Sequence, residues 1–256
     1  MRCFSESYFR EATPGHTCRN RKLVACIRQY CDMKGIKEIH KMYNEKYYED
    51  RERSIGLQVE IDNMIRMLSP KSHDKILEVG CGGGSLLKRL ETYSATVIGL
   101  DSSEEAVRIA KARVNNCEVI LGDARRMDFA DASFDKLAIQ HLIEHFSDGY
   151  AVLKEWNRVL RNNGILVIAT PNIYYPDKSL FYDESHVHLY SMKELRQLTE
   201  MADFTVETLY SIAPFLFVFP NRTNIGVRLY KFFRFLPYFS SRGRTIIIKG
   251  RKREAY

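Results

Sequence analysis

The hydrophobic residues of this chain fall in short, almost continuous runs, separated by longer segments in which apolar and polar residues recur at helical spacing. Runs of this kind predict strands that are buried on both faces, and the segments between them predict helices that cover those faces. The alternation therefore predicts an α/β domain with a parallel sheet at its centre. The predicted strands are residues 75–79, 95–100, 117–121, 134–139, 164–169, 204–210 and 245–249.

The segments between the strands carry helix signals. Residues 39–68 have apolar groups on a rough 3.6-residue spacing and predict one helix. Ser102 with Glu105, and Ser191 with Glu194, have the spacing of a capping box at a helix N-terminus. The other predicted helices are residues 85–93, 102–114, 150–160 and 191–201.

Two parts of the chain do not fit this alternation. Residues 1–40 have no clear hydrophobic period and are predicted to be an N-terminal extension of unknown role, ahead of a domain that spans residues 41–256. Residues 213–243 form an aromatic and basic insert between the last two predicted strands. Four of the six cysteines lie in the extension at spacings that match no common zinc pattern, and no role is predicted for them. They are Cys3, Cys18, Cys26 and Cys31.

The positive charge of the chain is concentrated near its C-terminus. The formal net charge is +7, and residues 222–256 contain ten lysines and arginines against one acid. The insert 213–243 interleaves such cations with aromatic residues, which fits three interpretations: a substrate lid, a surface that contacts an anionic membrane, or a surface that stacks on single-stranded nucleic acid. We expect the lid first and the nucleic acid last.

The chain has no apolar run of 18 or more residues, and its first 20 residues contain no hydrophobic leader. A membrane-spanning helix and a secretory signal are therefore not expected. We expect a cytoplasmic protein, with peripheral membrane contact through residues 213–243 as one option.

A glycine-rich turn follows the first predicted strand and opens the next helix. Its sequence, Glu78-Val-Gly-Cys-Gly-Gly-Gly84, lets the backbone approach a ligand and presents unpaired helix N–H groups to it. A dinucleotide site would place its third glycine at position 85, where this chain has a serine. A nicotinamide-dependent oxidoreductase is therefore disfavoured.

Two acidic residues follow the next two strands at the same edge of the sheet. Asp101 closes the strand at 95–100, where a carboxylate can bind ribose hydroxyls. Asp123 follows the strand at 117–121, where a carboxylate can meet an adenine amine. Each alone could be a turn or capping residue, but their positions beside the glycine turn indicate a ligand site at the carboxyl edge of the sheet.

Several ordered stretches resemble the class I S-adenosylmethionine-dependent methyltransferases, in the small-molecule branch of the ubiquinone-biosynthesis type (types 11 and 23). The resemblance covers residues 75–172, and residues 183–204 are similar to the C-terminal half of such enzymes. It implies a Rossmann-like, doubly wound sheet of seven mostly parallel strands, with the last strand antiparallel. The stretches are ILEVGCGGGSLLKRL, VIGLDSS, GDARRMDF, FDKLAIQHLIEHFSD, LKEWNRVLRNNGILVIATPN and DESHVHLYSMKELRQLTEMADF.

The resemblance implies S-adenosyl-L-methionine as the cofactor and gives the site residues their roles. The glycine turn would line the methionine part, with Glu78 anchoring it. Asp101 would bind the ribose, Asp123 would meet the adenine edge, and Gln140 would border the sulfonium. The implied cofactor-binding residues are Glu78, Gly80, Cys81, Gly82, Gly84, Asp101, Ser102, Asp123, Ala124 and Gln140.

Methyl transfer from a sulfonium needs an aligned nucleophile and a dry site, and an acceptor hydroxyl is also helped by a base. The resemblance implies that His186 faces the acceptor; His141 is the second candidate, with Glu144 as a carboxylate partner. The fourth strand is followed by Gln140-His-Leu-Ile rather than Asn/Asp-Pro-Pro-Tyr/Phe, which argues against methylation of an exocyclic base amine. No metal-binding constellation is evident in the sequence.

We therefore predict an enzyme: a methyltransferase that acts on oxygen in a small, lipid-like or glycan-linked acceptor. Two alternatives stay open. One is a non-catalytic module of methyltransferase fold at a membrane surface, and the other is an RNA methyltransferase. No oligomeric state is predicted.

Overall fold

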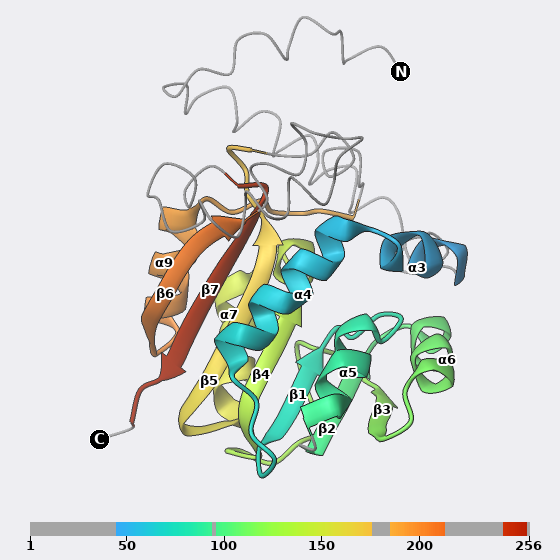
Figure 1. Cartoon of the computed structure of the whole chain (residues 1–256). Helices are drawn as coiled ribbons and strands as arrows, with labels where there is room; N and C mark the ends of the chain where they lie inside the picture. The colour runs from blue at the N-terminus through green and yellow to red at the C-terminus, as the bar shows by residue number, and fades with distance from the viewer. Residues whose placement is uncertain (1–44, 94–95, 176–184, 213–242, 255–256) are drawn as a thin grey trace, which may run out of the picture.

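The structure is a computed structural model that describes residues 45–93, 96–175, 185–212 and 243–254. Its strands are β1 (Lys75–Val79), β2 (Thr96–Asp101), β3 (Cys117–Leu121), β4 (Phe134–Gln140), β5 (Leu160–Pro171), β6 (Phe204–Ile212) and β7 (Thr245–Lys252). In the described part of the chain they form one seven-stranded sheet in the order β3-β2-β1-β4-β5-β7-β6 (Figure 1). Neighbouring strands are parallel except at β7, which is antiparallel to both β5 and β6. The predicted fold is thus confirmed.

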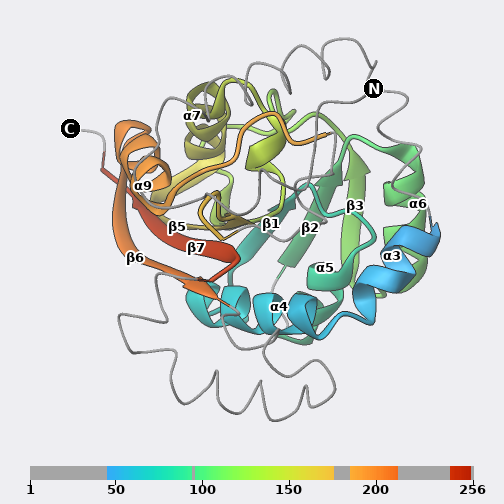
Figure 2. The ribbon, with the colours of Figure 1, turned by 90° about the horizontal axis from the view of Figure 1, so that it is seen from above.

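Helices cover both faces of the sheet (Figure 2). One face carries α4 (Ile55–Leu68), α5 (Ser85–Leu90) and α6 (Glu104–Arg113), and the other carries α7 (Gly149–Val159) and α9 (Met192–Met201). A polar helix, α3 (Glu45–Glu52), precedes α4. Two 3₁₀ turns complete the described elements, η2 (Glu91–Tyr93) and η3 (Ile143–His145).

The core is divided between the two faces in the way that the strand period requires. In β5, Ile165 and Val167 pack in the core beneath α4, whereas Leu166 and Ile168 pack in the core beneath α7. Trp156 of α7 is fully buried, and its indole N–H donates to the carbonyl of Ala124 at 3.1 Å. The loop after β3 is thereby fixed to the helix layer.

The helix predicted at 39–68 was wrong in one respect: within its described part it is two helices. The break falls at Arg53 and Ser54, where Ser54 is extended (φ −72°, ψ 120°). The reason is the hydrophobic pattern: α4 has an apolar stripe that packs on the sheet, whereas α3 buries none of its residues against the described chain. Because α3 has no apolar stripe to pack on the sheet, it is not held in line with α4, and the chain changes direction between the two helices.

The capping box predicted at Ser102 and Glu105 was also wrong. The N-cap of α6 is Ser103, whose hydroxyl accepts a hydrogen bond from the backbone N–H of Ala106 at 3.3 Å. Glu105 lies one residue too close to the cap for the reciprocal bond of a capping box, and its carboxylate instead pairs with Arg108 on the helix surface. The helix therefore begins later than predicted.

The second predicted capping box is half confirmed. Ser191 caps α9 by accepting from the backbone N–H of Glu194 at 3.2 Å. The Glu194 carboxylate does not close the box, because it pairs with Nε2 of His188 at 2.7 Å. The contact with His188 takes the place of the capping hydrogen bond that the Glu194 side chain would otherwise make.

Strand β5 is longer than predicted. It begins at Leu160, which was predicted as the last helical residue, and Leu160 pairs with Phe134 of β4 ahead of a register shift. The local helical spacing at 150–160 could not reveal this pairing, because the partner strand is remote in sequence.

No helix in the described ranges is both long enough and apolar enough to cross a membrane. Residues 1–44 and 213–242 lie outside the described residues. The predictions for the N-terminal extension, its four cysteines and the aromatic insert therefore stay predictions.

We expect Ser103→Ala to lower the free energy of unfolding by about 1 kcal/mol, because it removes an N-cap acceptor. For a domain of this size that corresponds to a fall in Tm of about 2–4 °C, measurable by circular dichroism. The matched control is Ser102→Ala, which should leave Tm unchanged. An equal or larger fall for Ser102→Ala would contradict the assignment of the cap.

Candidate functional site

A cavity of about 650 Å³ opens at the carboxyl ends of β1, β2, β3 and β4. It lies where the strand order reverses between β1 and β4, which is the usual ligand position in sheets of this kind. All of the residues predicted for the site line it except Gly84. Those that line it are Glu78, Gly80, Cys81, Gly82, Asp101, Ser102, Asp123, Ala124, Gln140, His141 and His186.

The glycine turn after β1 has a backbone that other residues rarely adopt. Gly80 and Gly82 have positive φ values of 73° and 50°. A Cβ added at Gly80 would lie 2.9 Å from the side chain of Leu142, and one at Gly82 would lie 3.0 Å from Tyr48. The turn therefore needs glycine both for its conformation and for the space around it.

Gly84 has a different role from the one predicted. It is the N-cap of α5, with φ 81°, and it does not line the cavity. An added Cβ would lie 3.2 Å from Cα of Ala110 in α6. Gly84 thus permits close packing between α5 and α6 rather than close approach to a ligand.

Asp101 connects the glycine turn to the end of β2. Its Oδ2 accepts a hydrogen bond from the backbone N–H of Gly82 at 2.8 Å, and its Oδ1 accepts from the N–H of Ser103 at 2.9 Å. The carboxylate lines the cavity between these two amides. It therefore shapes the turn and also presents acceptor oxygens to a ligand.

Glu78 places a buried acid beneath the same turn. The side chain lines the cavity, and its Oε2 has no hydrogen-bond partner among the described residues. Burial, together with the nearby Asp101 carboxylate, raises the pKa of the Glu78 carboxyl well above its ordinary value; the hydrogen bond from the Leu87 backbone offsets this only in part. A buried acceptor without a partner is costly, so a ligand that donates to it would be stabilised.

The loop after β3 forms another wall of the cavity. Arg125 binds the Asp123 carboxylate, with 2.7 Å between Nη2 of Arg125 and Oδ2 of Asp123. The hydrogen bond from Arg125 lowers the pKa of Asp123. The carbonyl of Ala124 is taken by Trp156. A ligand amine at Asp123 would therefore share the carboxylate with Arg125, while Ser102 lies exposed near the rim.

Helix α3 supplies three lining residues that the sequence did not reveal: Tyr47, Tyr48 and Arg51. Tyr48 lies against Gly82, and the Arg51 guanidinium donates to the Tyr47 hydroxyl at 2.8 Å. The available signal was a strongly polar segment that carries two adjacent tyrosines and an arginine but no apolar stripe. Such a segment is poorly suited to cover a core and better suited to line a polar cavity.

The carboxylate of Glu52 is the main anchor of α3, alongside a longer ion pair between Glu45 and Arg108 at 3.5 Å. Oε1 of Glu52 accepts a hydrogen bond from the Ser85 hydroxyl at 3.1 Å and pairs with Arg113 of α6 at 3.2 Å. Arg113 also donates to the carbonyl of Gly83. The helix is thus held over the glycine turn by polar contacts.

The carboxylates of Glu60 and Glu144 meet the imidazole of His141 at the end of β4. Nε2 of His141 lies 2.9 Å from Oε2 of Glu60, and its Nδ1 lies 3.3 Å from Oε1 of Glu144. Burial alone would lower the pKa of His141, but the two carboxylates raise it to about 9. Gln140 also donates to Glu60, at 3.2 Å. His141 has a positive φ of 52°, the strained backbone that is often found at functional sites.

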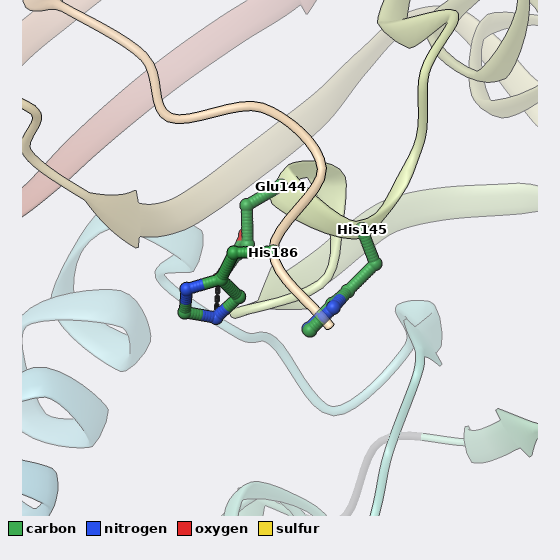
Figure 3. A group of neighbouring side chains, drawn as sticks. All are labelled: Glu144, His145 and His186. Atoms are coloured by element: carbon green, nitrogen blue, oxygen red, sulfur yellow. Dashed lines mark ion pairs between the residues drawn. The ribbon is translucent and has the colours of Figure 1, made fainter. Parts of the chain in front are cut away.

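Glu144 organises this cluster through both its side chain and its main chain. Burial would raise the pKa of its carboxyl, but the hydrogen bond and charge of His141, with the other imidazoles, lower it to about 2. Its backbone carbonyl accepts from the N–H groups of Val187 and His188, both at 2.9 Å. The segment that carries His186 is thereby held beside η3, with His186 Nε2 4.0 Å from Glu144 Oε1 (Figure 3).

Comparisons with known proteins relate this chain to methyltransferases. Residues 77–168 match a protein family described as a methyltransferase domain. A probable S-adenosylmethionine-dependent methyltransferase of Mycolicibacterium smegmatis is 32% identical over 134 residues, which cover 52% of each chain. The ubiquinone biosynthesis O-methyltransferase of Pelagibacter ubique is 32% identical over 120 residues, covering 43% of this chain and 50% of that protein. This chain spans about half the length of the curated relatives it matches.

Solved structures share the fold. The complex between the Haloferax volcanii Trm112 methyltransferase activator and a putative methyltransferase contains a chain that superposes with a TM-score of 0.64. The match covers 90% of this chain and 99% of that one, at 21% identity. The likeness therefore extends well beyond the matched family region, residues 77–168.

We expect Glu78→Gln to alter how the stability of the unliganded protein depends on pH. An acid whose pKa is raised by folding binds its proton more tightly in the folded state, so stability falls as pH rises above the ordinary pKa of 4.5. The glutamine has no charge to bury and keeps an acceptor for Leu87. Its Tm should exceed that of the wild type at pH 8, and the difference should shrink towards pH 5.

Differential scanning calorimetry at the two pH values measures this. Glu118→Gln, at an exposed position on β3, is the control and should show no such trend. A Tm difference for Glu78→Gln that is the same at pH 5 and pH 8 would refute the raised pKa.

Proposed function

Because residues 77–168 match a methyltransferase domain family, we propose that this chain is an S-adenosylmethionine-dependent methyltransferase of class I. It binds S-adenosyl-L-methionine in the cavity and transfers the methyl group to an oxygen of a small, lipid-like or glycan-linked acceptor. The observation that supports this most directly is the unpartnered Glu78 oxygen beneath a turn that requires glycine. An amino group of a ligand would satisfy that oxygen.

The residues present fit the cofactor along its whole length. Glu78 would hold the ammonium of the methionine part, and Arg51 offers a cation for its carboxylate. Asp101 has acceptor oxygens for the ribose hydroxyls, and Asp123, which lines the same cavity, would meet the adenine edge. The backbone amides of the glycine turn and the tyrosines of α3 would enclose the middle of the molecule.

When bound, S-adenosyl-L-methionine supplies a methyl group whose transfer breaks a C–S bond, forms an O–CH₃ bond and leaves the electron pair on sulfur as S-adenosylhomocysteine. The protein must align the acceptor and keep water out. An acceptor hydroxyl must also lose its proton. His186, buried beside Glu144, is the group best placed to take it.

His141 is better suited to positioning than to proton transfer. Both of its ring nitrogens already face carboxylates, Nε2 towards Glu60 and Nδ1 towards Glu144. It therefore connects α4 to η3 and fixes the orientation of Glu144 behind His186.

The two alternative functions have less support. The glycine turn and Asp101 keep the features that a cofactor site needs, which favours catalysis over a non-catalytic module. The membrane-docking and RNA-binding interpretations rest on residues 213–243, of which the structure describes Gly243.

We expect Gly80→Ala to weaken S-adenosylhomocysteine binding at least about tenfold, because the added methyl meets Leu142 and the positive φ is strained. Isothermal titration calorimetry measures this directly. Gly56→Ala is the matched control, because its Cβ would meet no atom closer than 3.4 Å within the described structure. It should bind like the wild type. No heat for the wild type at high micromolar ligand would refute the proposed cofactor.

Mass spectrometry of cell extract incubated with the enzyme and isotope-labelled cofactor should reveal a labelled methyl ether or ester. We expect His186→Gln to reduce formation of this product by about 10²–10⁴-fold, with unchanged S-adenosylhomocysteine affinity, because a proton acceptor contributes that much to catalysis. His188→Gln, a neighbouring histidine that pairs with Glu194, should retain activity. Cofactor binding without any labelled product would favour the non-catalytic module.

A further inference from the structure

We propose that Glu144, His145 and His186 together bind one divalent transition-metal ion of the Zn²⁺ class. One carboxylate oxygen and one nitrogen from each imidazole lie within 4.8 Å of one another (Figure 3). Both histidines line the cavity at the end where β4 and the segment at 185–187 meet. This inference deepens the proposed function, because the ion would activate the acceptor and His186 would serve as its ligand.

The donor set suits such an ion. Two imidazoles and one carboxylate are a ligand combination of catalytic zinc sites, in which the fourth position stays open to water or substrate. Tetrahedral ligands at about 2.1 Å from zinc lie about 3.4 Å apart. Glu144 Oε1 and His186 Nε2 are 4.0 Å apart, so a small side-chain rotation brings them to that spacing.

The surroundings of the Glu144 carboxylate favour binding of a cation. Glu144 is fully buried, and its Oε1 faces ring nitrogens but accepts no hydrogen bond from a backbone or hydroxyl group of the described residues. Its neighbours on that side are imidazole nitrogens, those of His141 at 3.3 Å and His186 at 4.0 Å. The other oxygen, Oε2, accepts from the Thr170 hydroxyl at 2.9 Å. The carboxylate is thus oriented by one oxygen and presents the other towards the histidines.

His145 has the orientation that metal-bound histidines usually have. Its Nδ1 lies 3.0 Å from the carbonyl oxygen of Ser185, which can only accept, so Nδ1 carries the proton. Nε2 is then the nitrogen with the lone pair. Metal-ligating histidines commonly donate their second N–H to a carbonyl in this way, and ligating carboxylates are likewise fixed by an outer hydrogen bond.

The ion would explain how an acceptor hydroxyl ionises in a buried site. A hydroxyl in the open coordination position has a lowered pKa, and its proton leaves to solvent. The resulting oxygen anion then attacks the methyl group in the transfer described above. With the ion bound, His186 and His145 would be its ligands, and His186 would not serve as the base of the metal-free reaction proposed above.

The test is titration of the full-length protein with Co²⁺, followed by visible absorption. We expect one equivalent to give the spectrum of a low-coordinate nitrogen and oxygen site, and Zn²⁺ to displace it. Glu144→Gln and His186→Gln should each weaken binding by at least about tenfold, because each removes a ligand. His188→Gln is the matched control, since His188 lies in the same segment but pairs with Glu194, and it should titrate like the wild type.

Two further measurements make the result decisive. A variant with serine at Cys3, Cys18, Cys26 and Cys31 should bind the same equivalent, since the proposed ligands include no thiolate. His145→Gln removes the third proposed ligand and should also weaken Co²⁺ binding, so the test still stands if the Glu144 variant misfolds. Circular dichroism should show the native fold in every protein compared. Absence of the Co²⁺ spectrum, or a spectrum unchanged by the Glu144 and His186 substitutions, would overturn the inference.

The outcome is separable from that of the proposed function. If the protein binds no metal but forms labelled product at a rate that a chelator does not change, the metal site fails and methyl transfer stands. If Co²⁺ binds as described but calorimetry shows no S-adenosylhomocysteine binding, the metal site stands and the cofactor assignment fails.

Discussion

The carboxylate of Asp101 is the interaction on which the cavity depends. It accepts from Gly82 and Ser103 and so joins the turn after β1 to the turn after β2. Without this connection, the amide of Gly82 would lose its partner, and the turn would be held to β2 only by the Leu100 carbonyl, which accepts from Gly80 and Cys81, among the described residues. The same charge raises the pKa of Glu78 beneath it. One side chain therefore sets both the shape and the electrostatic character of this end of the site.

The cavity has two chemically distinct ends. At the glycine turn, acidic groups stand beside backbone amides and an arginine, which suits a ligand with ammonium, hydroxyl and carboxylate groups. At the end of β4, the carboxylates of Glu60 and Glu144 lie beside the imidazoles of His141, His145 and His186. The switch point of the sheet brings these ends together, so that a group held at one can react at the other.

Much of the fold followed from the sequence because it depends on local periodicity. The strands buried on both faces had nearly continuous apolar runs, and six of the seven begin within one residue of the predicted start. The acids at the ends of β2 and β3 could be placed because parallel strands share an edge. What failed depends on contacts between remote residues. Glu60 reaches His141 from 81 positions away, and α3 lies over the turn through Glu52. No periodicity in the sequence encodes such contacts.

The attachment of α3 has a kinetic consequence. This helix has no fully buried residue; Tyr48 packs against Gly82 and Gly83 of the glycine turn, whereas the described links of the helix to α5 and α6 are ionic or hydrogen-bonded. A nucleoside enclosed beneath it can leave once these polar links open, without disturbing either core layer. Its residence time is then governed by ion pairing, and it shortens as ionic strength rises. Turnover in such an arrangement responds to salt even where the chemical step does not.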